Sequence, residues 1–329
     1  MVAAVTEGVA KQIVRVRFEV ERNYAGWRLD RYLAEKIRRL TPERIAWLVE
    51  HRLETEDGSR LTLDSQVTPG LRFALLREFE PEPEVPLEFG VVHDDGELLV
   101  VDKPAGLPVH PTARYFQHTF TALARARWPD RKIDPAHRLD RETSGLLACG
   151  TARTHTSRLK REFAEGRVEK TYLALALGAP GEDRFEVDAP LALTGQSLVR
   201  VRMHVAPGGQ EARTAFEVLG RRRAPDGAAV TLLACRPATG RQHQIRAHLA
   251  HAGLPLVGDK IYGPDEAIFD RFTRRALTAE DEATLRLPRQ ALHAWRLALR
   301  HPRTLEPVAL EAPLAPDLAR FWDSCREGA

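Results

Sequence analysis

An aspartate flanked by arginines stands in the polar segment His137-Arg138-Leu139-Asp140-Arg141-Glu142-Thr143-Ser144-Gly145. The positive neighbours favour the charged form of Asp140, and the turn-forming Thr-Ser-Gly fixes the backbone beside it. A carboxylate held in this way can attack an electrophilic carbon or accept a proton. The same residue types also form ordinary turns before strands, or surface ion networks. The segment therefore offers a catalytic carboxylate without excluding a structural role.

The stretch HRLDRETSGLL resembles the signature of the RluA-type pseudouridine synthases, which isomerise uridine in RNA. Five further stretches resemble segments of this family, in the same order. They are LLVVDKPAGLPVHP from residue 98, VEKTYLA from 168, TGRQHQIRAHL from 239, GDKIYG from 258 and QALHA from 290. The resemblance covers roughly residues 88–317 and implies the pseudouridine synthase fold there. It also implies that Asp140 is catalytic, that Tyr172 lies against the flipped base, and that Arg246 is the cation paired with Asp140.

The reaction that the resemblance implies detaches uracil from the sugar and rejoins it through carbon-5. It needs no redox step and no metal, so we expect no cofactor. A uridine inside stacked RNA must first be extruded. Arg138 matches a family arginine that contacts the displaced nucleotide. Further groups that could bind RNA phosphates or support the loop are Lys103, His110, Arg141 and Lys170.

Two other functions fit part of the sequence. A metal-dependent hydrolase could use His243, His248 and His251, but their spacing leaves His243 on a different helix face, and no HExxH pattern is present. A catalytically silent RNA-binding protein would use the basic residues alone. Without the resemblance, Arg246 would be read as an exposed helix arginine and Tyr172 as a half-buried strand tyrosine.

Strands and helices in irregular order must position these residues. Strands are expected at 98–101, 168–177, 229–235 and 292–299, and helices at 120–127, 154–165 and 241–252. The last helix would place Gln242 and Arg246 four residues apart, so that both can face one site. The segment 263–288 could be an insertion that faces the substrate. The lack of a regular β-α-β rhythm predicts an α+β fold with a mixed, mainly antiparallel sheet.

A smaller N-terminal α/β module is expected at 14–78. The apolar residues of segment 29–40 have helical spacing, and Thr41-Pro42-Glu43 is typical of the start of a second helix. Two short helices on a small sheet, with a strand at 60–63, resemble the RNA-binding module named after small-subunit ribosomal protein four. A plain structural mini-domain is the alternative. The arginines expected to bind RNA from the first helix are Arg28, Arg31, Arg38 and Arg39.

Alternating proline and acid in Phe79-Glu80-Pro81-Glu82-Pro83-Glu84-Val85-Pro86 predicts a semi-rigid linker. We therefore expect four parts along the chain. They are a flexible leader at 1–13, the RNA-binding module at 14–78, the linker at 79–87 and the catalytic domain at 88–329.

The composition of the 329 residues, 43% hydrophobic and 29% charged, is typical of a soluble globular protein. The sequence shows neither a membrane-spanning apolar run nor a secretory signal, so we expect a cytoplasmic protein. Three separated cysteines fit neither a disulfide framework nor a metal knuckle. Only 7 of the 49 basic residues are lysines. Arginine suits RNA, although a GC-rich genome gives the same bias. The expected enzyme is a monomer acting on large-subunit ribosomal RNA, with transfer RNA as the alternative, and the sequence does not identify the target uridine.

Overall fold

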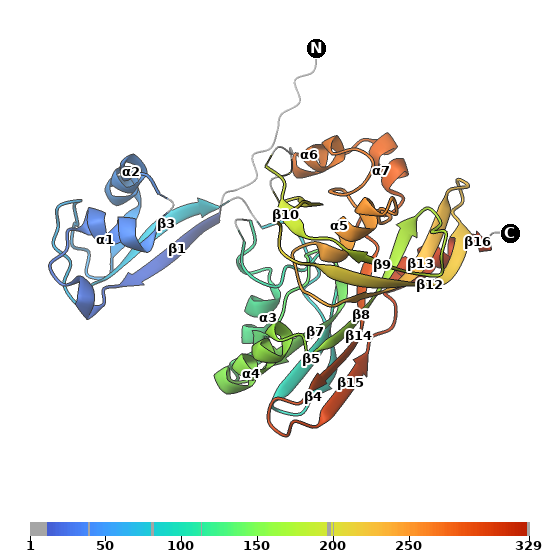
Figure 1. Cartoon of the computed structure of the whole chain (residues 1–329). Helices are drawn as coiled ribbons and strands as arrows, with labels where there is room; N and C mark the ends of the chain where they lie inside the picture. The colour runs from blue at the N-terminus through green and yellow to red at the C-terminus, as the bar shows by residue number, and fades with distance from the viewer. Residues whose placement is uncertain are drawn as a thin grey trace, which may run out of the picture. The chain divides into compact units, whose positions relative to one another are not determined.

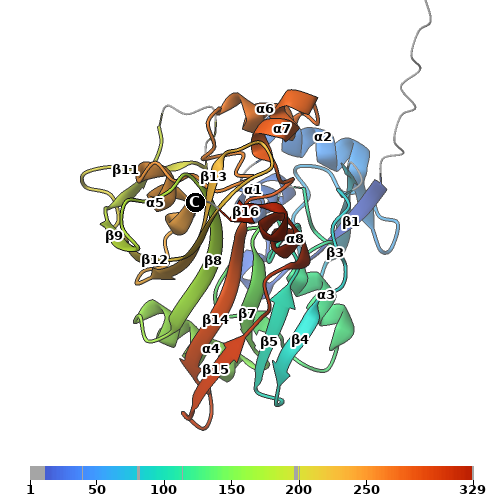
Figure 2. The same cartoon turned by 90° about the vertical axis from the view of Figure 1, so that its right-hand side faces the viewer.

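The computed structural model describes residues 12–38, 40–79, 82–112, 114–195, 199 and 201–327 (Figures 1 and 2). Most of the predicted leader, and Arg39, lie outside these residues. The chain divides into two compact units, Met1–Pro83 and Glu84–Ala329. Within the described residues, no helix has the length and apolar character needed to cross a membrane.

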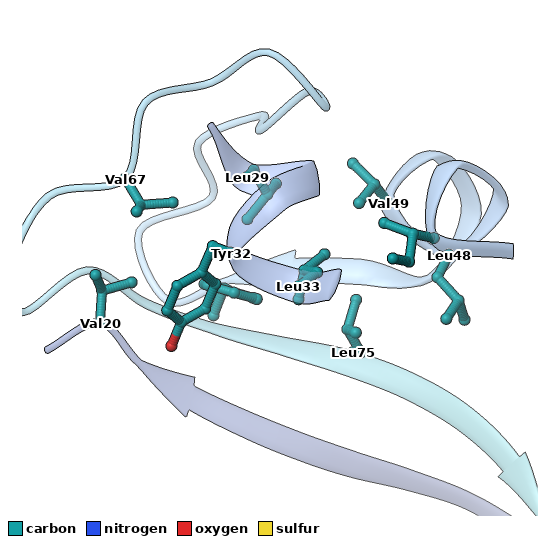
Figure 3. Close-up of a cluster of buried hydrophobic side chains, with 10 residues drawn as sticks. Val20, Leu29, Tyr32, Leu33, Leu48, Val49, Val67 and Leu75 are labelled. Atoms are coloured by element: carbon teal, nitrogen blue, oxygen red, sulfur yellow. The ribbon is translucent and has the colours of Figure 1, made fainter. Parts of the chain in front are cut away.

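The small unit packs two helices against an antiparallel sheet with the strand order β1-β3-β2. Its elements are β1 (Gln12–Glu19), the 3-10 turn η1 (Arg22–Tyr24), α1 (Leu29–Lys36), α2 (Pro42–Arg52), β2 (Leu53–Thr55) and β3 (Arg72–Phe79). Figure 3 shows the buried core between the helices and the sheet. Tyr32 and Leu33 of α1 meet Leu75 of β3 there. A continuous core of this kind explains why so short a segment can fold.

Helix α2 begins as the sequence predicts. The hydroxyl of Thr41 accepts a hydrogen bond from the backbone N–H of Arg44 (3.4 Å), and Pro42 occupies the first turn. The residues predicted to face the core, Ile45, Leu48 and Val49, are buried.

Two predictions for the small unit are wrong. Residues 60–63 form no strand, because this segment instead runs beside the start of α1. There the backbone N–H of Leu29 donates to the carbonyl of Ser65 (2.9 Å), and that of Asp30 donates to the carbonyl of Leu63 (3.1 Å). These bonds satisfy N–H groups that a helix start leaves without an internal partner. Helix α1 also ends at Lys36, so it is shorter than the apolar spacing suggested.

A mixed sheet organises the large unit and confirms the predicted fold class. In the described part of the chain it has eleven strands, with the main order β16-β12-β13-β8-β14-β7-β5-β4. Only the pairing of β14 with β7 is parallel among the described ladders of this sheet. Figure 2 shows β8, β14, β7 and β5 following one another across it. The strands on the main path are β4 (Gly90–Asp94), β5 (Leu98–Lys103), β7 (Ser144–Gly150), β8 (Glu169–Leu177), β12 (Arg213–Arg223), β13 (Ala229–Pro237), β14 (Leu292–Arg300) and β16 (Arg326–Glu327).

Three further strands pair at the sides of this sheet, and two form a separate hairpin. The side strands are β6 (Asp134–Pro135), β9 (Arg184–Asp188) and β15 (Pro307–Glu311), and the hairpin joins β10 (Leu191–Leu193) to β11 (Met203–Val205). Strand β5 is buried on both faces, because Leu98 and Val100 belong to one buried cluster and Leu99 and Val101 to another. Its continuous apolar run is typical of a central strand.

Six helices in the described residues complete the large unit: α3 (Phe120–Arg127), α4 (Arg153–Ala164), α5 (Gln244–His251), α6 (Ala267–Thr273), α7 (Ala279–Leu285) and α8 (Pro316–Ser324). Helices α3 and α4 confirm the predictions at 120–127 and 154–165. The helix predicted at 241–252 starts later, at Gln244, because His243 has a left-handed backbone with φ of 54°. Gln242 therefore does not lie on the helix that carries Arg246, so the helical spacing predicted for the pair is wrong, although both residues line the same cavity.

Gly145 fixes the place where the polar loop enters the sheet. Its φ is 105°, and a Cβ added there would collide with the backbone of Ala294 in the neighbouring parallel strand β14. Only glycine combines this backbone conformation with so close an approach. The loop that contains Asp140 is thereby held at the end of β7, near the centre of the sheet.

Candidate active site

Asp140 lies in the loop before β7, and buried cations hold the backbone on its C-terminal side. Lys103 Nζ donates to the carbonyl of Arg141 (3.1 Å), and an Arg289 guanidinium nitrogen donates to the carbonyl of Glu142 (3.1 Å). Both cations are buried. The side chain of Asp140 is 21% exposed. The loop is therefore fixed while its carboxylate can still be reached from outside.

Arg246 is a buried guanidinium shared by two carboxylates. Its Nε and one terminal nitrogen donate to the two oxygens of Asp259 (2.7 and 2.8 Å), while the other terminal nitrogen donates to Oδ2 of Asp140 (2.8 Å). The side chain of Arg246 is 4% exposed and that of Asp259 is fully buried. The bidentate pair fixes the guanidinium plane and directs its remaining donor at Asp140.

The environment keeps Asp140 ionised. Burial alone would raise the pKa of its carboxyl group, but the positive charge of Arg246, the neighbouring His243 and the hydrogen bonds from Arg246 and Gln290 together outweigh burial and hold the pKa below its usual value. The same balance lowers the pKa of Asp259. At neutral pH the site therefore contains two carboxylates and one guanidinium.

The two oxygens of Asp140 have different surroundings. Oδ2 accepts the bond from Arg246 and a longer one from Gln290 Nε2 (3.3 Å). Among the described residues Oδ1 accepts no hydrogen bond, and it faces Nε2 of His243 at 3.8 Å. Oδ2 thus anchors the carboxylate and leaves Oδ1 open for chemistry.

Tyr172 lies on β8 and lines the same cavity as Asp140 and Arg246. This cavity has a volume of about 560 Å³, within the range of roughly 300–1,000 Å³ typical of small-ligand sites. Burial raises the pKa of Tyr172, so the phenol stays protonated at neutral pH. The three residues implied to be catalytic therefore meet at one cavity, although the chain separates Asp140 from Arg246 by 106 residues.

Of the other residues expected near RNA in the large unit, two line the Asp140 cavity and two line a second one. Arg138 and Lys170 line the first cavity, and the side chain of Arg138 is exposed. His110 and Arg141 line a second cavity of about 430 Å³, which also reaches Asp140. These positions allow contact with a substrate.

Two of these cations already have protein partners. Arg141 donates to the hydroxyl of Tyr115 (2.7 Å) and to Glu142 (3.1 Å). Lys103 is fully buried, and its Nζ donates to three backbone carbonyls. Of the two roles considered for Lys103, the structure fits loop support and is incompatible with a phosphate contact.

The predicted RNA-binding arginines of the small unit differ in their partners. Arg28 forms ion pairs with Asp30 (2.8 Å) and Asp64 (2.6 Å), and it precedes helix α1. Arg38 pairs with Glu35 and follows the helix. Only Arg31, among the described three, lies on α1. Its guanidinium stacks over a tryptophan ring, and no ion pair is recorded for it in the described part of the chain.

Two arginines of the small unit stack closely on tryptophan rings, and neither forms an ion pair with an acidic side chain among the described residues. The Arg31 guanidinium lies 4.2 Å from the ring centre of Trp27, and that of Arg44 lies 4.3 Å from the ring centre of Trp47. Trp47 is 38% exposed. Sequence reasoning missed the second stack, although Arg44 and Trp47 are three residues apart in the predicted second helix.

Sequence reasoning also missed three residues that build the site. Asp259 orients Arg246, and Gln290 bridges Asp140 to the hydroxyl of Thr143 (2.8 Å). Tyr262 binds His243. All three lie in the GDKIYG and QALHA stretches, which carried the resemblance without any assigned roles. The resemblance therefore pointed to these segments, but the residues that they contact are distant in sequence, so their roles could not be assigned.

The histidines considered for a metal site serve separate functions. His248 is buried and its ring nitrogens meet the hydroxyl of Thr214 and the carbonyl of Ala189, both at 3.0 Å. His243 binds Tyr262 at 3.1 Å, and His251 is exposed. In the ranges that the structure describes, no group of three metal-ligating side chains is assembled. The three free cysteines, Cys149, Cys235 and Cys325, are buried and separate.

Comparison with known proteins gives one consistent family. Residues 97–251 match the family model described as RNA pseudouridylate synthase. The chain is 33% identical over 324 residues to ribosomal large subunit pseudouridine synthase D of Nitrosomonas europaea, a match covering 94% of this chain and 88% of that protein. It is 36% identical to the dual-specificity RNA pseudouridine synthase RluA of Pasteurella multocida, covering 68% of this chain and 93% of the relative.

A solved structure shares the fold. Human RNA pseudouridylate synthase domain containing 1 superposes with a TM-score of 0.59 and 25% sequence identity. The match covers 75% of this chain and 92% of the human chain.

Proposed function

The chain belongs to the RluA-type family of RNA pseudouridine synthases, and we propose that it modifies large-subunit ribosomal RNA with Asp140 as its catalytic carboxylate. The observation that supports this role is the contact between Asp140 and the buried Arg246 at a cavity that also contains Tyr172. A charged carboxylate with one anchored and one open oxygen is suited to attack carbon or to accept a proton.

The reaction is an isomerisation in which atoms and electrons balance within the nucleotide. The bond from the anomeric carbon to the base nitrogen breaks, and a bond from the same carbon to carbon-5 of uracil forms. Carbon-5 then loses its proton, and the nitrogen released from the sugar gains one. We assign the carboxylate step to Oδ1 of Asp140, because Oδ2 is occupied by Arg246 and Gln290. The reaction itself requires no external oxidant or reductant.

Tyr172 and Arg138 are proposed to hold the extruded nucleotide. The cavity they line is large enough for a nucleotide, and an aromatic ring can stack on uracil. The exposed guanidinium of Arg138 lies at the rim, where it can contact the displaced strand. Lys170 lines the same cavity and offers a cation to a phosphate.

The small unit is proposed to be the RNA-binding module and the large unit the catalytic domain. Arg31 and Arg44 are better candidates for RNA contacts than Arg28 and Arg38. Arg28 and Arg38 already form ion pairs with acidic side chains. A guanidinium stacked on tryptophan keeps its charge available to phosphate. Transfer RNA is the alternative substrate, and the name of one relative, a dual-specificity RNA pseudouridine synthase, is compatible with more than one target. We further propose that the enzyme works as a monomer in the cytoplasm.

A map of pseudouridine in ribosomal and transfer RNA tests this function. We expect cells that lack the protein to lose one or a few sites in large-subunit ribosomal RNA. The wild-type gene and Asp183→Asn, which changes a carboxylate that is 77% exposed, should restore them, whereas Asp140→Asn should not. Loss of sites only in transfer RNA would identify transfer RNA, and not ribosomal RNA, as the substrate. An unchanged map in both RNAs would contradict the proposed activity.

A further inference from the structure

His243 occupies an unusual position beside the proposed carboxylate. It directly precedes helix α5, its backbone is left-handed, and its side chain is only 10% exposed. It lines both cavities that reach Asp140. A histidine in the left-handed region carries a conformational cost that the surrounding structure must offset. This cost is consistent with a functional role for the position of the His243 ring.

The hydrogen bonds around Tyr262 favour one position for the ring proton of His243. The backbone N–H of Met203 donates to the hydroxyl of Tyr262 (2.8 Å), so this hydroxyl is an acceptor there. Its own proton is then available for Nδ1 of His243, at 3.1 Å. When Nδ1 accepts, the proton of a neutral imidazole must lie on Nε2. The opposite tautomer would direct a lone pair at the carboxylate of Asp140.

Charged groups surround this imidazole from several elements. Arg246 of α5 and Arg138 of the polar loop disfavour a positive ring, whereas Asp140 and Asp259 favour one. Burial is the largest influence, and with Arg246 it lowers the pKa of His243 to about 4. The ring is therefore neutral at physiological pH and has one N–H to offer.

We propose that His243 is a positioning residue that directs its Nε2–H at Oδ1 of Asp140. The separation of 3.8 Å is too long for a direct hydrogen bond, so the N–H orients the open oxygen without occupying it. A hydroxyl group of a bound nucleotide could bridge the two atoms. The inference rests on the proposed role of Asp140 and adds a partner for its second oxygen.

One turn holds both partners of the carboxylate. Asp259 clamps Arg246, and its Oδ1 also accepts the backbone N–H groups of Ile261 and Tyr262 (3.0 and 3.1 Å). Tyr262 then holds His243, and its ring meets the imidazole edge to face. The turn therefore fixes the donor on Oδ2 and the donor facing Oδ1 together.

Nuclear magnetic resonance of the full-length protein labelled with ¹⁵N-histidine tests the tautomer without any RNA. The His243 signals are those lost in His243→Asn, since asparagine tolerates a left-handed backbone. We expect a protonated Nε2 and an unprotonated Nδ1, and we expect Tyr262→Phe to shift the Nδ1 signal. A protonated Nδ1, or an Nδ1 signal unaffected by Tyr262→Phe, would overturn the proposal.

A second measurement tests whether His243 acts through Asp140. The ¹³C carboxyl signal of Asp140, identified by its loss in Asp140→Asn, should titrate at higher pH in His243→Asn than in the wild type. His251→Asn is the matched control, because this histidine is exposed at the far end of the same helix. An Asp140 titration unchanged in His243→Asn would overturn the proposal even if the tautomer is as expected.

Kinetics on RNA that carries the mapped site complete the test. At saturating RNA, His243→Asn should slow single turnover about tenfold to a hundredfold, because Asp140 loses the N–H that orients its open oxygen, an effect comparable in size with loss of a polar contact to a charged group. The RNA concentration that gives half-saturation should stay unchanged. Tyr262→Phe should slow it less, and the double variant should be no slower than His243→Asn. If the double variant is slower by the product of the two single effects, Tyr262 does not act through His243, and the proposal is contradicted. A wild-type protein inactive on every RNA would refute the proposed function, whereas the resonance measurements would still decide the geometry.

Discussion

Replacing Arg246 by methionine removes the cation that lies between the partly exposed Asp140 and the buried Asp259. Methionine keeps an unbranched apolar stem but lacks the guanidinium, so the change removes the charge and its hydrogen bonds. Asp259 would lose both of its bonds from the guanidinium and is fully buried. Asp140 would keep only the longer bond from Gln290 (3.3 Å). The protein would then have to bury negative charge without a counterion.

The expected loss of stability is large and depends on pH. Breaking a buried ion pair costs about 3–5 kcal/mol in the free energy of unfolding. In the wild type both carboxyl pKa values are depressed, so their stabilisation is present above the unfolded pKa of about 3.9 and is lost as pH falls further. In Arg246→Met burial acts without the cation and raises both pKa values. The variant therefore gains stability as pH falls through those raised values, and its deficit narrows toward pH ~4.

Urea unfolding of wild type and variant at several pH values between about 4 and 8 measures this difference. Arg184→Met is the control, because Arg184 is 81% exposed in its pair with Glu217, and a loss of about 0–1 kcal/mol is expected. Single-turnover rates should fall in Arg246→Met, with the acidic limb of the pH profile moved upward. A deficit as small as the control's, or one that stays constant with pH, would refute the buried-network reasoning.

Three further changes test other parts of the structure. Asp140→Asn should leave a folded, RNA-binding protein with no detectable product, and more than trace turnover would remove Asp140 from its role. A protein starting at Glu84 should fold, bind RNA more weakly with a salt slope reduced by about 0.7–0.9 per lost phosphate contact, and keep most of its saturated single-turnover rate. An unchanged affinity and slope would make the small unit structural, and a collapsed rate would make it part of the site. His137 is half-buried and its neutral ring accepts the N–H of Ala148 (3.0 Å), and loss of water around the ring lowers its pKa to about 3. The free energy of unfolding should therefore fall as pH drops from about 6.5 toward 3, and His137→Gln should flatten that slope, as acid titration would show.

The fold was predictable where local patterns coincide with tertiary structure. The start of α2 could be read from Thr41 and Pro42 because a capping hydroxyl and an N-terminal proline act within one turn. The segment 60–63 misled the prediction because a short apolar alternation fits a strand equally well. The carbonyl of Leu63 instead accepts the N–H of Asp30 in the first turn of α1, and sequence alone does not show a contact between residues so far apart.

The candidate site was predictable as a set of residues but not as a network. Asp140, Tyr172 and Arg246 came from resemblance, and the structure brings them to one cavity. The bond that defines the network, from Arg246 to Asp259, depends on a turn that follows α5. For Lys103 the sequence left a phosphate contact and loop support open, because a lysine is normally exposed; the three carbonyls that replace its water fit loop support.

Arg246 binds the two carboxylates in different ways, and this predicts that Asp140 can be changed without loss of the fold. One guanidinium serves two negative charges, and Asp259 takes the bidentate face together with two backbone N–H bonds. Asp140 receives the single remaining donor and stays partly exposed. Neutralising Asp140 would leave a complete, charge-balanced pair between Arg246 and Asp259. The negative charge on Asp140 is therefore more than the fold requires, which supports the chemistry proposed for its open oxygen.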